Sequence, residues 1–147
     1  MKKYSTDNVS YKTFRPHGRV EFSVVDENII IYRAWGPFNS EFFSVLEAIE
    51  PDALIEVQSN VRSWGEVVVF EDSCMAVDNF FLEFSAYLKS MKARDLVPIA
   101  SAYVFSNNIE GGLLMKDKYK KCYQDAGLVF STFADEETAL SWIKSCF

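Results

Sequence analysis

The sequence predicts an α/β domain with a mixed sheet of roughly five strands, an antiparallel hairpin near the N-terminus, and helices packed on the sheet. Three observations lead to this prediction. Two strand-like segments near the N-terminus are separated by a short turn. Strand-like and helix-like segments then alternate to the end of the chain, the order that gives parallel strands with right-handed crossovers. The chain has 147 residues, 49% of them hydrophobic, which is enough to bury the core of one domain.

The hairpin is the first regular structure that the pattern indicates. Apolar and polar residues alternate over 20–24, which is the period of a half-buried strand. Residues 26–28, Asp-Glu-Asn, are typical of a turn, and the apolar segment 29–35 follows as a more buried strand. Because the turn is so short, the two strands should pair antiparallel.

Helical structure should follow over 40–60. Asn39 or Ser40 can cap its start by accepting hydrogen bonds from the first backbone N–H groups. Pro51 fits the first turn of a new helix better than the middle of an existing one. The segment is therefore either one kinked helix or two helices in tandem, and residues 54–57 can also be interpreted as a short strand.

The remaining elements alternate regularly. In chain order they are a strand over 65–70, a helix over 77–91, a strand over 99–105, a helix over 113–126, a strand over 128–133 and a final helix that begins near Asp135. The clearest of them is the helix over 77–91, where apolar residues recur with the period of a core-facing helix. Gly127 follows the next helix, as glycine commonly does.

Charge and hydropathy exclude several classes of function. The net charge is −6, and residues 1–19 hold five basic residues and one acidic residue, so the remainder carries −10. An acidic body repels phosphate backbones, so we expect no nucleic-acid partner. No apolar run approaches the ~20 residues that span a bilayer, and no apolar stretch follows the first lysines as in a signal peptide. We expect a cytoplasmic protein without a membrane span, in which residues 1–18 form a basic, loosely ordered arm and residues 19–147 the α/β domain.

The few cysteines and the single histidine restrict metal and covalent chemistry. Cys74, Cys122 and Cys146 are odd in number and show no CxxC spacing, which is typical of reduced thiols. Cys74 has a carboxylate rather than a cation nearby, which disfavours its thiolate. His17 lies in the predicted arm, so it provides no fixed base for a nucleophilic serine or cysteine. We expect no catalytic residues, no metal and no cofactor, and hence no enzyme.

Three stretches carry a likeness to a known family. They are Trp35 to Asn39 at the end of the hairpin, Trp64 to Phe70 before the clearest helix, and Phe133 to Ile143 near the C-terminus. Together with the order of elements, they resemble the STAS domain (sulfate transporter and anti-sigma-factor antagonist) of the SpoIIAA-like family, over residues 18–147. The resemblance implies a SpoIIAA-like fold and a bacterial regulatory module that acts by binding another protein.

The resemblance also points to one loop. In anti-sigma antagonists of this family, a partner kinase phosphorylates a serine in an Asp-Ser-Ser-Gly or Asp-Ser-Thr-Gly motif between a strand and a helix. The matching stretch here reads Asp72-Ser73-Cys74-Met75, which lacks the second hydroxyl and the glycine. The chain therefore resembles the family without its phosphoserine motif.

Candidate site residues gather where the carboxyl ends of parallel strands should meet, which is the usual ligand edge of α/β folds. The loops expected there are 35–39, 71–79 and 107–112. Their polar residues either contact a partner or only turn the chain and cap a helix, and the tryptophans either line a pocket or belong to the core. The candidate ligand-binding or partner-binding residues are Trp35, Asn39, Trp64, Asp72, Ser73, Asp78 and Asn79.

The leading hypothesis is a non-catalytic regulatory or interaction module that binds a protein partner or a second copy of itself. Its contact surface would be the loop 71–79 and the helix that follows. The alternative is a domain that binds a small apolar or amphipathic ligand, such as a lipid, in an aromatic pocket between Trp35 and Trp64 at one end of the sheet.

Overall fold

The computed structural model describes residues 2–8 and 18–147, except for the side chain of Asp78; His17 lies outside the described residues. The elements in chain order are β1 (Lys3–Ser5), the 3-10 turn η1 (Thr6–Asn8), β2 (Arg19–Val25), β3 (Ile29–Trp35), α1 (Phe42–Gln58), β4 (Gly65–Glu71), α2 (Asp78–Ala93), β5 (Ser101–Val104), α3 (Gly112–Asp125), β6 (Phe130–Phe133) and α4 (Glu136–Ser145). No helix in the described ranges is both long enough and apolar enough to cross a membrane.

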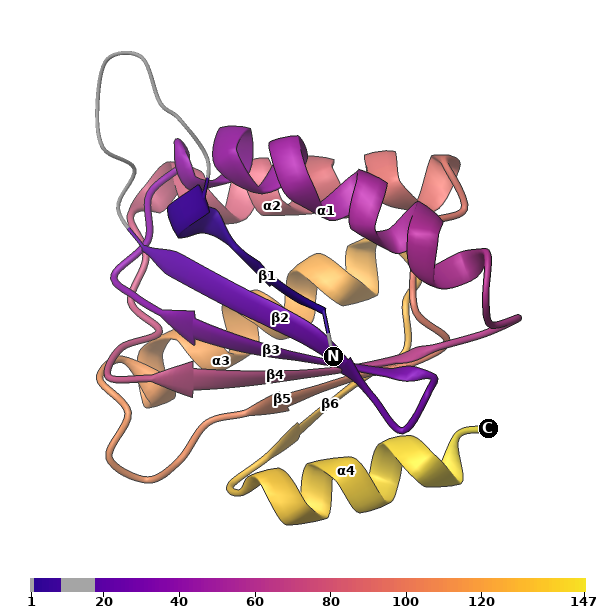
Figure 1. Cartoon of the computed structure of the whole chain (residues 1–147). Helices are drawn as coiled ribbons and strands as arrows, with labels where there is room; N and C mark the ends of the chain where they lie inside the picture. Colours follow the sequence, from indigo (N-terminus) through magenta and orange to yellow (C-terminus); the bar gives the residue numbers. More distant parts are fainter. Residues whose placement is uncertain (1, 9–17) are drawn as a thin grey trace.

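The sheet is mixed and its strands lie in sequence order, β1 to β6 (Figure 1). The pairs β1–β2 and β2–β3 are antiparallel, and β3, β4, β5 and β6 run parallel. The predicted α/β class and the antiparallel N-terminal hairpin are therefore confirmed. The connecting helices α1, α2 and α3 all lie on one face, so crossovers of a single hand add each new strand on the same side of the previous one.

The sheet has six strands rather than five, because β1 lies within the segment that we expected to be a loosely ordered arm. Besides the pairing of β1 with β2, contacts of Tyr4 and Thr6 hold this segment in place. The Tyr4 ring stacks on Phe22 with 4.8 Å between ring centroids, and the backbone N–H of Val20 donates to the Thr6 hydroxyl at 3.0 Å. A three-residue strand with mostly polar side chains has no detectable period, so the pattern did not reveal it.

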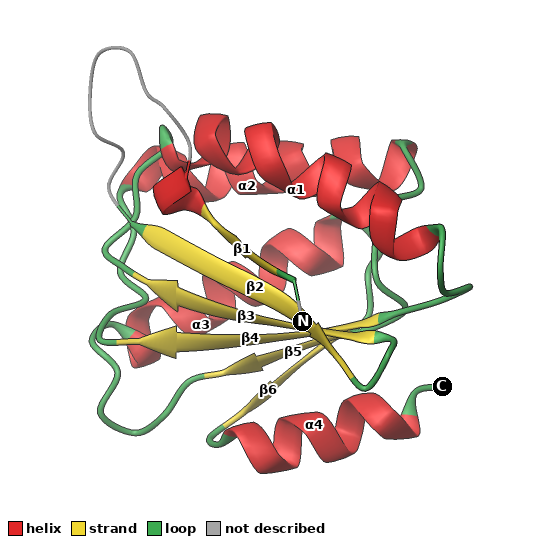
Figure 2. Cartoon of the chain, in the orientation of Figure 1, coloured by secondary structure: helices red, strands yellow, loops and turns green. Residues whose placement is uncertain are grey.

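Helices cover the two faces of the sheet unequally (Figure 2). The main core lies on the face covered by α1, α2 and α3, and it is rich in aromatic side chains such as Phe43, Phe80 and Tyr119. The opposite face carries α4, which packs over β4, β5 and β6 around Ile143 and Val67. Side chains alternate along β4 between these two cores, so Glu66, Val68 and Phe70 all face the main core.

The segment that followed the hairpin was ambiguous in sequence, and the structure resolves it as one helix. Pro51 lies inside α1, which runs from Phe42 to Gln58, so neither two tandem helices nor a strand over 54–57 is formed. Leu46, Leu54 and Val57 are buried on either side of the proline. Burial of this continuous apolar face outweighs the hydrogen bond that the proline removes.

Candidate functional site

Loops after β3, β4 and β5 meet at the carboxyl edge of the parallel strands. We call residues 36–39, 72–77 and 107–112 the carboxyl-edge platform. The backbone N–H of Gly36 donates to the Ser73 carbonyl and that of Phe38 to the Met75 carbonyl, both at 2.8 Å. These bonds continue the pairing of β3 with β4 beyond the last residues of the strands, so the first two loops form one rigid surface.

The third loop joins through Glu110. Its carbonyl accepts from the backbone N–H of Cys74 at 3.0 Å, and its own N–H donates to the Asp72 carbonyl at 3.1 Å. Glycines allow the loops to approach so closely. A Cβ on Gly36 would lie 2.5 Å from the Ser73 carbonyl oxygen, and Gly111, with φ of +84°, packs on Met75.

Ser73 lies inside this platform rather than on it. The residue is 4% exposed. Its hydroxyl donates to the Glu110 carboxylate at 2.8 Å and accepts from the backbone N–H of Met75 at 3.1 Å. Both hydrogen-bonding capacities are thus used to fix the loop, which favours the interpretation of Ser73 as a turn residue over that of a contact residue.

Cys74 is also buried, and its thiol donates to the Glu110 carbonyl at 3.4 Å. Burial, with a smaller contribution from the Glu110 charge, raises the pKa of this thiol to about 11. The thiol therefore stays protonated at neutral pH and is a poor nucleophile. Among the described residues, no three His, Cys, Asp or Glu side chains converge in the way that a metal site requires.

The two candidate tryptophans, Trp35 and Trp64, lie at opposite ends of the sheet, so the predicted pocket lined by both is not formed. Trp35 pairs with Glu71 at the carboxyl edge, whereas Trp64 precedes Gly65, which pairs with Ile29 at the amino edge. The Arg19 guanidinium lies 4.0 Å from the centroid of the Trp35 ring. Trp64 is 2% exposed and belongs to the main core, as the second of our two interpretations held.

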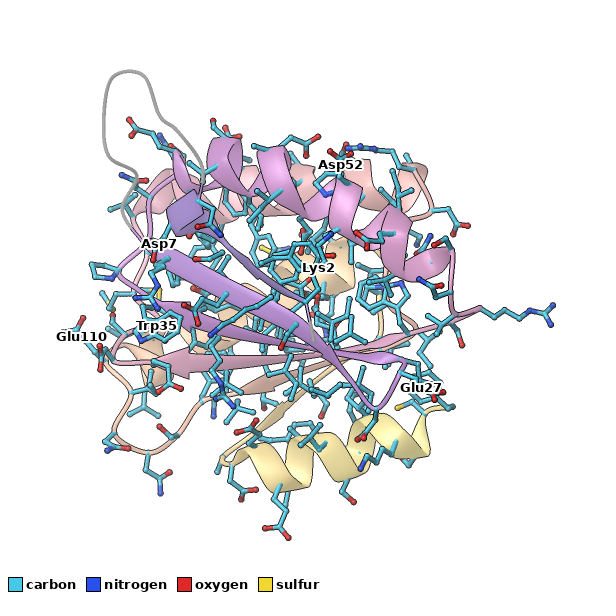
Figure 3. All side chains as sticks on the ribbon, in the orientation of Figure 1. Lys2, Asp7, Glu27, Trp35, Asp52 and Glu110 are labelled. Atoms are coloured by element: carbon cyan, nitrogen blue, oxygen red, sulfur yellow. The ribbon has the colours of Figure 1, made fainter. Side chains whose placement is uncertain are left out.

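The other candidates lie on or near the platform. Asp72 and Asn79 are exposed, and Figure 3 shows Trp35 and Glu110 at the same edge. Asn39 does not cap α1, whose N-cap position is Glu41. Its Oδ1 is buried and accepts no hydrogen bond from the described part of the chain. Of Asp78, only the backbone, at the start of α2, is described.

Sequence reasoning missed the most exposed apolar feature of this edge. Leu113 and Leu114, at the start of α3, are 97% and 68% exposed. They border a groove of about 410 Å³, lined by Phe105, Ser106, Asn107, Ile109, Gly111, Gly112, Leu113, Leu114 and Lys116. The signal was present in the helical period. Met115, Tyr119, Cys122 and Tyr123 form the buried stripe of α3, which leaves both leucines off the core-facing side.

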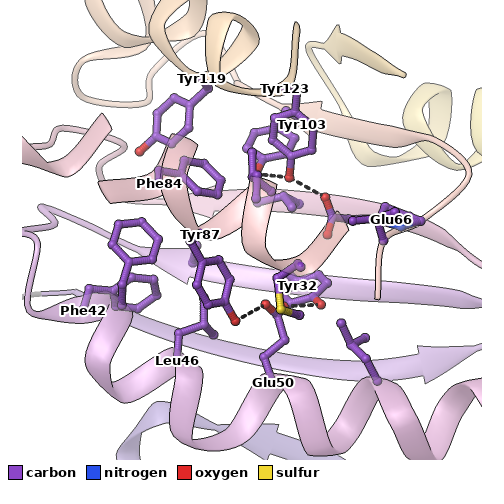
Figure 4. A pocket seen from close by; sticks show the side chains of 18 of the residues that line it. Tyr32, Phe42, Leu46, Glu50, Glu66, Phe84, Tyr87, Tyr103, Tyr119 and Tyr123 are labelled. Atoms are coloured by element: carbon purple, nitrogen blue, oxygen red, sulfur yellow. Dashed lines mark hydrogen bonds between the residues drawn. The ribbon is translucent and has the colours of Figure 1, made fainter. Parts of the chain in front are cut away.

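A second unexpected feature lies inside the main core, where two carboxyl groups meet a set of tyrosines (Figure 4). Glu50, from α1, accepts from the Tyr32 hydroxyl at 2.5 Å and from the Tyr87 hydroxyl at 2.7 Å. Glu66, from β4, accepts from the Tyr123 hydroxyl at 2.6 Å. Tyr123 is also hydrogen-bonded to Tyr103 at 2.7 Å.

Burial controls the protonation of this cluster. It raises the pKa of Glu66 to about 7, the hydrogen bond from Tyr123 opposes this change, and the nearby charge of Glu50 adds to it. Burial likewise raises the pKa of Glu50, against the hydrogen bonds from Tyr32 and Tyr87. One hint of the cluster is present in the strand pattern, since Glu66 interrupts a strand whose other residues are apolar up to Phe70.

Comparison with known proteins adds no identification. No family model matches the chain, and searches of curated proteins and of solved structures find no match. The function that the chain can perform is therefore inferred from its own surfaces and cavities.

Proposed function

We propose that this chain is a non-catalytic, STAS-like interaction module that binds a partner protein through the carboxyl-edge platform and the adjoining start of α3. The observation that carries the proposal is the pair of leucines, Leu113 and Leu114, exposed beside the groove. Single exposed apolar residues are common on protein surfaces, but adjacent ones at the border of a groove are typical of a binding site.

The energetics favour an apolar anchor. Burying one leucine side chain fully contributes about 1.5–3 kcal/mol, so a partner that covers both gains several kcal/mol before the costs of association. Lys116 lines the groove, and Asp72 and Glu110 are exposed nearby on the platform. An apolar centre with charged residues around it is the usual anatomy of a protein–protein interface.

The platform also limits the entropic cost of binding. Backbone hydrogen bonds hold the three loops to one another, and Ser73 and Glu110 fix their side chains together. A surface that is already ordered loses little conformational freedom when a partner docks. With a net charge of −6, the chain is better suited to a neutral or basic partner than to a second acidic copy.

The SpoIIAA-like part of the proposal rests on the order of elements. After β1, the chain follows the order that the sequence pattern predicted and on which the resemblance rests, a hairpin and then three β-strands, each preceded and followed by a helix. The buried Ser73 hydroxyl suits a module that works without the phosphoserine switch. We place this module in the bacterial cytoplasm as part of the same proposal.

A differential capture experiment tests the proposal. The tagged chain, a Leu113→Ser/Leu114→Ser variant and an Ile55→Ser control are incubated with native bacterial lysate. Ile55 is 55% exposed on α1, so the control removes an exposed apolar residue from a helix that does not form the groove. We expect a protein that the wild type and the control retain and that the double variant loses.

The oligomeric state is measured first, by native mass spectrometry of the purified chain. If the wild type is a dimer and the double variant is a monomer, the partner that binds this surface is a second copy of the chain rather than a different protein. A monomer that captures the same proteins with and without the two leucines would contradict the proposal.

A further inference from the structure

A cavity of about 80 Å³ lies in the main core, between the sheet and the helices that cover it. Most of its lining is aromatic or aliphatic, including Phe42 and Leu46 from α1 and Phe84 from α2 (Figure 4). One water molecule needs about 10–15 Å³ of such space. The cavity therefore holds several waters or one small organic molecule.

Two carboxyl groups line this otherwise apolar space. Glu50 and Glu66 are each 7% exposed, and they come from different walls, α1 and β4. Both oxygens of Glu50 accept a tyrosine hydrogen bond. Glu66 accepts one at Oε1, from Tyr123. Within the described part of the chain Oε2 accepts no hydrogen bond; the buried Ser101 hydroxyl on the neighbouring strand, which also makes none, lies close enough to lower the pKa of Glu66. A buried carboxyl with a free oxygen thus lines the cavity.

The chemistry of the lining selects the charge of a ligand. Two acids repel an anion, and a neutral apolar molecule would leave the free oxygen of Glu66 without a donor. An organic cation provides both a donor and a compensating charge, and aromatic ring faces stabilise it further. Among the described residues no third acidic, histidine or cysteine side chain completes a metal site, so a small metal ion would lack ligands.

We propose that this cavity binds a small organic cation, a primary ammonium with a short alkyl chain. Its nitrogen donates to Oε2 of Glu66, and the Glu50 carboxyl lines the same space. Its alkyl part packs against the aromatic wall formed by Phe42 and Phe84. Of the lining residues, Tyr87, Val97 and Pro98 are partly exposed and the others are buried, so the ligand enters on their side.

This site is separate from the surface proposed for partner binding. Leu113 and Leu114 do not line the cavity, and Glu50 and Glu66 do not line the groove. A failure of either proposal is therefore distinguishable from a failure of the other.

Isothermal titration calorimetry with butylammonium tests the proposal, with 1-butanol as the neutral probe of nearly the same shape. Glu66→Gln keeps the shape of the side chain and removes the charge. Glu83→Gln is the matched control, because Glu83 is exposed on α2 and does not line the cavity. We expect butylammonium to bind the wild type and the control at about pH 8, and Glu66→Gln to weaken binding by at least about tenfold.

The pH dependence of the wild type provides a second measurement that needs no variant. The ammonium stays charged from about pH 6 to about pH 8, while Glu66, with its pKa of about 7, loses its proton. Tyr123 and Tyr103, whose pKa values burial raises well above 10, stay protonated, and burial also raises the pKa of Glu50. The affinity should rise roughly tenfold over this range.

Three results would overturn the proposal. They are no binding of butylammonium by the wild type, binding of 1-butanol as tight as that of butylammonium at both about pH 6 and about pH 8, and unchanged affinity in a folded Glu66→Gln variant. Circular dichroism checks the fold of each variant. If Glu66→Gln does not fold, the wild-type pH series decides, and an affinity that does not rise with pH refutes the proposal.

Discussion

The ionisation of Glu66 should make the chain less stable as the pH rises through neutrality. The pKa of this carboxyl is about 7 in the folded chain, against an ordinary value of 4.5. Folding therefore favours the protonated form. Between these two values the folded state holds a proton that the unfolded state has released, so the free energy of unfolding falls as the pH rises.

The size of the effect follows from the two pKa values. Each pKa unit corresponds to about 1.36 kcal/mol, so the full loss is about 3 kcal/mol, most of it between about pH 5 and about pH 8. Glu66→Gln cannot ionise, so the variant should lack this loss. Any effect of the amide on the hydrogen bond to Tyr123 is present at both pH values and cancels in the comparison.

Urea unfolding at about pH 5 and about pH 8, without added amines, measures the difference. We expect the wild type to lose about 2–3 kcal/mol more than Glu66→Gln over this range, and Glu83→Gln to follow the wild type. Identical pH dependence in the wild type and Glu66→Gln would show that the carboxyl is better solvated than its burial indicates, and the electrostatic reasoning would be refuted.

Two further predictions concern the carboxyl-edge platform. Gly36→Ala should lower the free energy of unfolding by about 1–3 kcal/mol, because its Cβ would lie 2.5 Å from the Ser73 carbonyl oxygen. Gly112→Ala is the matched control in thermal unfolding, because a Cβ there meets nothing within 4 Å. Equal melting temperatures of the two variants would contradict the packing argument. Ser73→Ala should lower the free energy of unfolding by about 1 kcal/mol, because the hydrogen bonds to Glu110 and Met75 are lost. Capture of a partner on the platform should be retained. Loss of capture by a folded Ser73→Ala variant would assign the hydroxyl to the contact surface.

The elements that could be predicted from sequence are those whose side chains alternate with a clear period. The hairpin and α2 are examples, because one face of each is buried and the spacing of their apolar residues indicates that face. β1 has no such pattern, and its position depends on the stacking of Tyr4 on Phe22, a residue of β2. α1 was ambiguous because Pro51 indicates a break that tertiary packing overrides.

The candidate site was predicted in part, for reasons of topology. Loops after parallel strands meet at one edge, and the structure brings Trp35, Asp72 and Ser73 together there. Trp64 was grouped with them by residue type, although it precedes its strand and thus lies at the other edge. Pairings between distant segments, such as Glu50 with Tyr87, leave no signal in a single sequence.

The short strand β1 has a consequence for association between chains. Without it, the seven-residue β2 would form the edge of the sheet and offer its unpaired backbone groups to any extended peptide. With it, the outermost strand spans only three residues and carries Lys3, whose ammonium lies 2.9 Å from the Glu21 carboxylate. Short, charged outer strands resist the edge-to-edge stacking from which aggregates grow. β1 thus shields this edge of the sheet against pairing with another chain, as well as extending the sheet.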